Sequence, residues 1–203
     1  MLEGDRVHAK LRLIEQQVLR GSSGGQGFAL EPSPTAESCT LHRPATAELV
    51  RTHFDPVALY ASPFVRALET AHQVGRVLGL LPKVVEELRE QDFGTLRGRP
   101  YAEYGRETAA QGPGRWSHRP PGGETLEEVA QRAGGALQAI ARAHLGEDVV
   151  VVSHGAVMAA LRGFAAGSYE DAPVPTRNAA GYVLHYRAAR WTLLDLVEAR
   201  AAR

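Results

Sequence analysis

The chain has 203 residues, a length typical of one domain with a single hydrophobic core. Its 23 basic and 23 acidic residues cancel, so the charge balance argues against a nucleic-acid partner. A single cysteine, Cys39, excludes a disulfide framework and a cysteine zinc site, and it fits a cytoplasmic setting. No apolar run approaches the roughly 20 residues that span a bilayer, and the first residues lack the apolar core of a signal peptide, so we expect no membrane association.

The first predicted strand covers residues 10–14, with apolar side chains at Leu11, Leu13 and Ile14. Residues 21–27 are rich in glycine and serine but lack the spacing of a phosphate-binding or dinucleotide-binding loop, which indicates a solvated loop. Three prolines in residues 28–44 predict irregular structure, and residues 45–53 have helical character.

A second predicted strand, residues 57–61, leads directly into Ser62-Pro63. A serine N-cap followed by a proline at the first helical position predicts a helix start. Arg66 then falls in the first turn of this helix, close to the carboxyl end of the strand, where the bland alternative is a solvated surface arginine. The predicted buried face of the helix consists of Val65, Leu68, Ala71, Val74 and Leu78.

Val84-Val85 suggests a third strand, and residues 99–123 are rich in proline, glycine and aromatic side chains. We interpret this second segment as a lid or insertion within a single domain that covers residues 1–203. Thr125 and Glu128 have the spacing of a capping box. They predict the start of a long amphipathic helix, which Gly146 closes.

Four consecutive valines, 149–152, indicate a strand that is buried on both faces of a parallel sheet. Ser153-His154-Gly155 ends this strand, and the apolar spacing that follows predicts a helix with Gly167 at its end. Ligands bind at the carboxyl ends of strands in open α/β sheets, and a helix N-terminus there attracts anions. His154 is therefore a candidate phosphate ligand or proton carrier, with a capping or core histidine as the alternative. Residues 181–186 and 191–197 predict a terminal hairpin.

Four stretches, in order along residues 57–165, resemble the histidine phosphatase superfamily, also called the phosphoglycerate mutase-like family. They are Ser62-Pro63-Phe64-Val65-Arg66-Ala67-Leu68-Glu69-Thr70-Ala71, Leu88-Arg89-Glu90-Gln91-Asp92-Phe93-Gly94, Pro121-Gly122-Gly123-Glu124-Thr125 and Val151-Val152-Ser153-His154-Gly155. The resemblance implies a three-layer α/β/α sandwich with a mostly parallel central sheet.

The resemblance also implies metal-independent chemistry through a phosphohistidine, with no cofactor. By this resemblance Arg66 and His154 bind the phosphoryl oxygens together with Gly155, and Glu90 is the acid that protonates the leaving oxygen. Arginine matches phosphate oxygens in a bidentate manner. A glutamate beside a phosphate has its pKa raised by the like charge, as a general acid requires. The predicted catalytic residues are thus His154 and Glu90.

The family's nucleophile lies in an Arg-His-Gly motif after the first strand, and that motif is missing here. In the preferred register Glu15, Gln16 and Gln17 stand in its place. A second register over residues 19–22 recovers an arginine and a glycine but no histidine. His8 precedes the strand, at the end away from the site, and is interpreted as a surface residue.

This substitution has a chemical consequence. An amide nitrogen with a delocalised lone pair is no nucleophile, and covalent catalysis needs an activated one. A glutamate in place of the arginine repels phosphate: one like charge at ~4 Å costs roughly 4 kcal/mol at an effective dielectric of about 20, or about a thousandfold in affinity. A side chain at Glu15 that pairs with Arg66 or His154 would fill the site internally.

Three hypotheses follow, and whether the chain is an enzyme stays open among them. The favoured one is a degenerate family member, a binding or regulatory protein for a small phosphorylated molecule or anion, with little or no phosphohistidine turnover. The second is an active metal-independent phosphomonoesterase with a rearranged site, in which His154 or a water molecule is the nucleophile. The third is a purely structural or interaction protein with no small-molecule site, against which the set of Arg66, Glu90 and His154 argues. The sequence predicts no metal site and identifies neither the substrate nor a protein partner.

Overall fold

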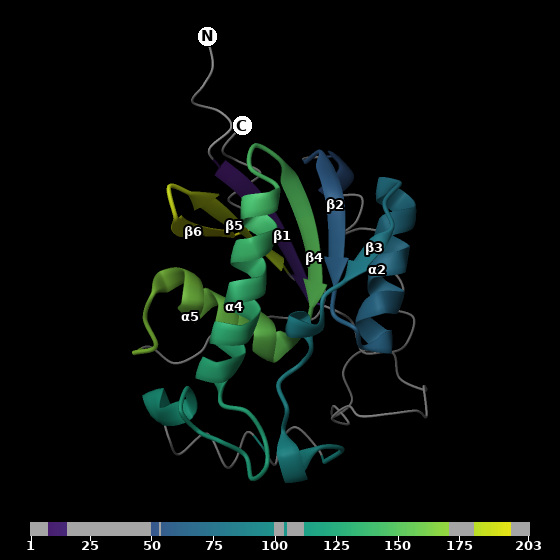
Figure 1. The fold of residues 1–203 in the computed structure, drawn as a ribbon. Coiled ribbons are helices and arrows are strands. Elements are labelled where there is room, and N and C mark those ends of the chain that lie inside the picture. The colour runs from purple at the N-terminus through teal and green to yellow at the C-terminus, as the bar shows by residue number, and fades with distance from the viewer. Residues whose placement is uncertain are drawn as a thin grey trace.

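The computed structural model describes residues 8–15, 50–52, 54–99, 104, 112–170 and 181–195. Strands of these segments form one six-stranded sheet in the order β3-β2-β4-β1-β5-β6 (Figure 1). The first four strands in that order run parallel, while β5 is antiparallel to β1 and β6 to β5. Their bounds are β1 His8–Glu15, β2 Pro56–Ala61, β3 Pro82–Val84, β4 Asp148–Ser153, β5 Gly181–Arg187 and β6 Arg190–Asp195.

Helices cover both faces of the sheet. Helix α2 (Val65–Leu78) packs on one face, and α4 (Leu126–Ala143) and α5 (Gly155–Ala166) pack on the other, with α4 in front of the sheet in Figure 1. Short 3-10 turns occur at Glu86–Leu88, Gly94–Leu96 and Gly112–Arg115. This arrangement confirms the predicted three-layer α/β/α fold with a mostly parallel sheet.

The four valines of β4 face two separate hydrophobic clusters. Val150 and Val152 pack toward α2, whereas Val149 and Val151 pack toward α4 and α5, and all four are fully buried. Full burial of one such side chain contributes on the order of 2 kcal/mol, so β4 anchors both layers. The predicted strand buried on both faces is confirmed.

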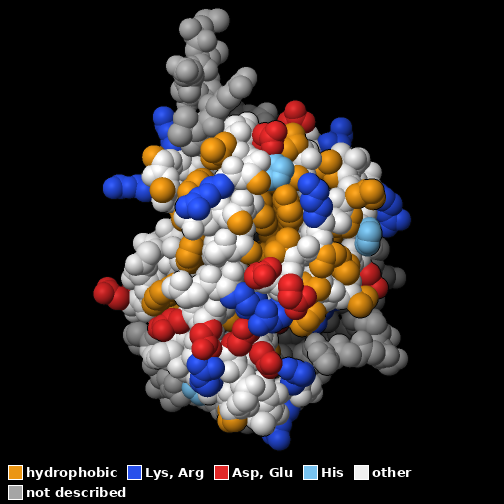
Figure 2. All heavy atoms as spheres, in the orientation of Figure 1, with side chains coloured by type: hydrophobic (Ala, Val, Ile, Leu, Met, Phe, Trp, Pro, Cys, Tyr) orange, Lys and Arg blue, Asp and Glu red, His pale blue; other side chains and the backbone are white. Residues whose placement is uncertain are grey.

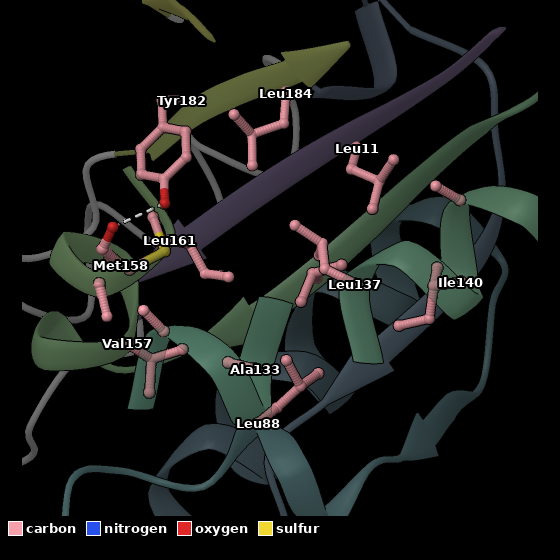
Figure 3. Packing of buried hydrophobic residues seen from close by; sticks show 14 of the residues in the cluster. Leu11, Leu88, Ala133, Leu137, Ile140, Val157, Met158, Leu161, Tyr182 and Leu184 are labelled. Atoms are coloured by element: carbon pink, nitrogen blue, oxygen red, sulfur yellow. Dashed lines mark hydrogen bonds between the residues drawn. The ribbon is translucent and has the colours of Figure 1, made fainter. Parts of the chain in front are cut away.

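The cluster on the α4–α5 side joins three elements at its centre. Figure 3 shows Leu11 of β1, Leu137 of α4 and Leu161 of α5 pointing into the same interior. The Tyr182 hydroxyl of β5 donates a 2.7 Å hydrogen bond to the Met158 carbonyl of α5, which satisfies a polar group inside this layer.

The predicted start of α2 is wrong by two residues. Phe64 occupies the N-cap position in place of Ser62, and its side chain makes no capping hydrogen bond. Proline disfavours the helical conformation of the residue before it, and the Ser62 hydroxyl is engaged by His154. Because the helix begins later, Val65 is 71% exposed and does not belong to the buried face.

Other boundaries also differ from those predicted. Strand β3 begins at Pro82 and ends at Val84, one residue before the predicted end, so Val85 lies outside it. His8 is the first residue of β1 and does not precede it, although it lies at the end opposite Glu15. Helix α4 ends at Ala143, with His144 as its C-cap, before Gly146.

Several predicted local signals are confirmed. The Thr125 hydroxyl accepts from the Glu128 N–H and the Glu128 carboxylate accepts from the Thr125 N–H, which completes the capping box. Gly167 ends α5 in the left-handed conformation, with φ 68°. Strands β5 and β6 form the terminal hairpin through Ala188 and Ala189, both with positive φ, as the two-residue turns of hairpins require.

The connections that leave the neighbouring strands β2 and β4 lie on opposite faces of the sheet. The helix that follows β2 packs on one face, and the helix that follows β4 packs on the other. Such a switch point leaves a crevice at the carboxyl ends of the two strands. In Figure 1 the loops at 86–99 and 112–125 lie at this end of the sheet.

Some predictions fall on residues outside the described ranges. They include Gln16, Gln17, the loop at 21–27, the irregular segment 28–44 and the first part of the helical pattern at 45–53, of which residues 50–52 are helical. The single domain over 1–203 and the lid over 99–123 stay predictions. None of the described helices is both long enough and apolar enough to span a membrane.

Candidate functional site

The carboxyl ends of β1, β2 and β4 lie side by side. Glu15 pairs with Ser153 in the parallel register of β1 and β4, and Ala61 pairs with Val152 in that of β2 and β4. The ladder continues one residue beyond β2, because the Ser62 N–H donates to the Val152 carbonyl at 3.0 Å. Ser62 and His154, 92 residues apart in sequence, therefore meet at this edge.

His154 lies between β4 and α5 and is fully buried. It occupies the N-cap position of α5, but its side chain caps nothing, so the capping alternative does not explain it. Its Nε2 atom lies 2.6 Å from the Ser62 hydroxyl oxygen, and its ring packs edge-on against Phe64. The Nδ1 atom is buried and has no hydrogen-bond partner among the described residues.

Arg66 reaches the same place from the first turn of α2. Its guanidinium lies 5.0 Å from the centre of the Phe64 ring, and its Nη2 atom is 3.9 Å from Oε2 of Glu90. Burial lowers the pKa of Arg66, and the Glu90 carboxylate opposes that shift. Because arginine stays protonated in proteins, this side chain supplies a partly buried positive charge.

Glu90 is the third group of the cluster. Its Oε2 atom lies 3.8 Å from Nδ1 of His154, and its carboxylate accepts hydrogen bonds from the N–H groups of Gln91 and Ala156. Ala156 belongs to the first turn of α5, so Glu90 occupies the position where a helix N-terminus attracts an anion. Burial raises the pKa of Glu90 to about 7, against the charge of Arg66 and the two N–H donors.

His154 is neutral at physiological pH in these surroundings. Burial, followed by the positive charges of Arg66 and Arg132, lowers its pKa well below 6.5. Glu90 is poised between its acid and its carboxylate form, while Arg66 keeps its charge. The chemistry that these three side chains offer is the binding of a small oxyanion and the delivery of one proton to it.

The segment that carries Glu90 is fixed by a second carboxylate, Glu124. This carboxylate accepts from Arg89 and, through both oxygens, from Arg132, and it also accepts from the Asp92 N–H. Arg132 donates in addition to the carbonyls of Glu87 and Arg89. We call Glu124, Arg89 and Arg132 the Glu124 cluster; it holds the residues on both sides of Glu90.

The structure brings together three of the predicted site residues and places a fourth beside them. Arg66, Glu90 and His154 converge, and Gly155 opens α5 directly after His154. The N–H groups of a helix's first turn have no acceptor within the helix, so that of Gly155 can serve an anion. Glu15 ends β1 at this edge, and Gln16 and Gln17 follow outside the described residues.

Sequence reasoning missed two contributors. Ser62 was interpreted as an N-cap, whereas its hydroxyl contacts His154; the following proline, which disfavours a helical residue before it, was the available signal. Arg132 lies in the middle of α4, where an arginine is normally solvated, and nothing local in the sequence marks it. Its role follows from its contacts with Glu124 and with the carbonyls beside Glu90.

Charged side chains gather around this end of the molecule. Figure 2 shows Lys, Arg, Asp and Glu side chains intermixed below the sheet, over the lower part of α4 and the loops beside it. Within the described part of the chain, no group of three or more His, Cys, Asp and Glu residues is arranged to hold a metal ion.

Known proteins resemble the chain both in sequence and in fold. The chain is 32% identical over 160 residues to a metal-independent phosphoserine phosphatase of Arabidopsis thaliana, which covers 73% of this chain and 64% of that relative. A mycobacterial glucosyl-3-phosphoglycerate phosphatase has a similar structure, with a TM-score of 0.76, 22% identity and coverage of 92% of this chain and 97% of the other. The complex of a mycobacterial glucosyl-3-phosphoglycerate phosphatase with inorganic phosphate matches with a TM-score of 0.74, 23% identity and coverage of 91% and 94%.

A family model described as the histidine phosphatase superfamily, branch 1, matches residues 42–199. The match begins after β1, so it does not test the interpretation of Glu15, Gln16 and Gln17. It does include the three converging side chains Arg66, Glu90 and His154. The chain therefore belongs to the histidine phosphatase superfamily.

Proposed function

We propose that this protein binds a small phosphorylated molecule through Arg66, His154 and the first turn of α5, and turns it over little or not at all. The observation that carries the proposal is the convergence of these groups around a histidine nitrogen that has no hydrogen-bond partner among the described residues. Such a buried nitrogen is costly unless a ligand meets it. A phosphoryl oxygen fits, because Arg66 and the helix N-terminus favour an anion.

The relatives support a phosphomonoester as the ligand class. The plant relative is a phosphoserine phosphatase by name, and a structural neighbour is described in complex with inorganic phosphate. The chain spans 64% of the plant relative's length, so its substrate is carried over here only as a class. The residues that select one phosphomonoester from another are assigned to the segment 99–123.

The low turnover is inferred from the sequence after β1. The register of β1 against β4 pairs Glu15 with Ser153, the residue before His154, so the next position along the chain is Gln16. By the resemblance and in the preferred register, this is the position of the family's nucleophilic histidine. A glutamine there supplies no nucleophile, and the fully buried, neutral His154 is a ligand for the phosphoryl group and not a replacement for it.

Titration calorimetry with inorganic phosphate tests the binding. We expect binding by the wild type and a loss of about tenfold or more in affinity for Arg66→Ala, because a charge-assisted hydrogen bond is removed. Arg76→Ala is the matched control, since Arg76 lies on the exposed side of the same helix, and its affinity should equal that of the wild type. Absence of binding in the wild type, or equal losses in both variants, would contradict the assignment of the site.

A further inference from the structure

Ser62 contacts His154 at Nε2, whereas Glu90 lies on the side of Nδ1. The hydroxyl oxygen lies 2.6 Å from Nε2 of His154 and 3.3 Å from the Phe64 backbone nitrogen, which donates to it. Both Ser62 and His154 are fully buried. The hydrogen-bond donor and acceptor of each contact can therefore be assigned from the neighbouring protein groups.

The Ser62 hydroxyl needs an acceptor for its own proton. The Phe64 N–H already uses one of its lone pairs, and Nε2 of His154 is the acceptor within reach among the described residues. A buried hydroxyl that donates to nothing loses the free energy of an unmade hydrogen bond. The Ser62 proton consequently points at Nε2, which must then carry a lone pair.

We propose that Ser62 is a positioning residue that holds His154 as the Nδ1–H tautomer, so that the histidine presents an N–H donor to an oxyanion in the site. A neutral imidazole has one donor and one acceptor nitrogen, so a lone pair on Nε2 places the proton on Nδ1. Nδ1 is the nitrogen that faces Glu90, whose carboxylate also lies 3.9 Å from Arg66. The other tautomer would turn a lone pair toward the anion and repel it.

The same geometry excludes Ser62 as a nucleophile. A hydroxyl 2.6 Å from a histidine, with a carboxylate 3.8 Å beyond the ring, has the order of groups found in serine hydrolases. Ser62, however, is fully buried and its hydroxyl lies at Nε2, whereas Glu90, which pairs with Arg66, lies at Nδ1, so a substrate held beside Arg66 and Glu90 meets Nδ1 and not the hydroxyl. The Ser62–His154 pair thus orients a ligand group and does not attack.

Nitrogen-15 NMR of the histidine-labelled protein at pH 8 measures the tautomer directly in the wild type. The two ring nitrogens of a neutral imidazole have different shifts and proton couplings, and His154→Gln identifies the resonances of His154. We expect the attached proton on Nδ1. A proton on Nε2, or on both nitrogens, would overturn the proposal.

Ser62→Ala should shift the tautomer toward Nε2–H and weaken inorganic phosphate binding by about tenfold or more, as the loss of a donor to a charged group does. Ser62→Thr, which keeps the hydroxyl, should restore both. Ser153→Ala is the matched control: Ser153 is equally buried, but its hydroxyl donates to the Leu88 carbonyl, so the His154 tautomer should not change. A tautomer that is unaffected by Ser62→Ala, or equally affected by Ser153→Ala, would contradict the role of Ser62.

The phosphate part of this proposal rests on the proposed function, whereas the tautomer does not. If the wild type shows the Nδ1–H tautomer but binds no phosphate, the proposed function fails and the role of Ser62 toward His154 stands. If phosphate binds and the proton is on Nε2, the role of Ser62 fails and the binding site stands.

Discussion

Glu90 occupies the position that an anionic ligand would take. Its carboxylate receives the Ala156 N–H at the start of α5 and lies within 4 Å of both Arg66 and His154. The sequence also suggests Glu15 as an internal anion for this site, and the side chain of Glu15 lies outside the described part of the chain. The charge of Glu90 therefore competes with any oxyanion that enters.

This competition predicts a pH-dependent affinity. Sulfate keeps its charge over the neutral range, so its binding reports the protein's groups alone. Because burial raises the pKa of Glu90 to about 7, sulfate should bind more tightly at pH 6, where Glu90 is largely protonated, than at pH 8. The groups that face Glu90 keep their charge states over this range: Arg66 and Arg132 stay cationic, and His154, with its lowered pKa, stays neutral.

Glu90→Gln should remove this dependence and raise the sulfate affinity at pH 8 by about tenfold or more, since a nearby like charge is deleted. Calorimetry at the two pH values measures it. Asp92→Asn is the control, because the Asp92 carboxylate pairs with the exposed Arg97, and its profile should follow that of the wild type. A profile that stays the same in Glu90→Gln would show that another group titrates.

The raised pKa of Glu90 also links folding stability to pH. The folded state holds the proton more tightly than the unfolded state, so the contribution is fully present below the usual pKa of 4.5 and is lost as pH rises to about 7. The shift corresponds to on the order of 3 kcal/mol. Urea unfolding should therefore find Glu90→Gln more stable than the wild type at pH 8, and a stability difference that is the same at pH 4.5 and pH 8 would contradict this cause.

The carboxylate of Glu124 links several described residues of the segment between β3 and α4. Glu124 binds Arg89 and Arg132 and receives the Asp92 N–H, while its own carbonyl accepts from the Gln91 side chain. These contacts fix the backbone on both sides of Glu90, which has no helix or strand of its own. The placement of the acid thus depends on the Glu124 cluster.

Glu124→Gln should destabilise the protein by roughly 2–4 kcal/mol, because two partly buried arginines lose their carboxylate. Faster hydrogen exchange at residues 88–94 should accompany the loss. The matched control is Glu128→Gln in the first turn of α4, whose partner Arg119 is exposed, so loss of this ion pair should change the stability little. Equal losses of stability in the two variants would contradict the special place of Glu124.

Helices α4 and α5 touch at a glycine. A Cβ on Gly134 would lie 2.5 Å from the Phe164 ring, while one on the neighbouring Gly135 would meet no atom within 4 Å. Alanine favours a helix by about 1 kcal/mol over glycine, so Gly135→Ala should stabilise the protein by up to that amount. Gly134→Ala should destabilise it by about 1–3 kcal/mol, because the ring must move. Thermal unfolding of both variants checks this, and a gain for both would show that the contact is loose.

Periodicity predicted the faces of these helices better than their ends. The buried sides of α4 and α5 follow from apolar spacing, and the capping box located the start of α4 correctly. The start of α2 is predicted two residues too early, because the Ser62 hydroxyl can either cap a helix or contact another side chain. A local rule assigns it to the helix, and the tertiary structure assigns it to His154, which is distant in sequence.

Across the whole molecule, the site lies where the two helical layers meet the same edge of the sheet. Arg66 comes from the α2 layer, His154 from the junction of β4 and α5, and Arg132 from α4. The family resemblance identified Arg66, Glu90 and His154, because their motifs are local in sequence. The proline after Ser62 signals only that Ser62 is not helical. The contacts of Ser62 with His154 and of Arg132 with the Arg89 carbonyl could not be predicted, since they join segments 92 and 43 residues apart.

The central claim is that this scaffold retains a phosphate pocket and lacks the nucleophile that would make it an enzyme. Hydrolysis of p-nitrophenyl phosphate without added metal, by the wild type and by a Glu15→Arg, Gln16→His, Gln17→Gly variant, measures this. We expect no turnover above background from the wild type, turnover from the variant, and its loss when Arg66→Ala is added. A wild type that already turns over the substrate, with activity that depends on Arg66 and His154, would contradict the claim and place a nucleophile elsewhere in the chain.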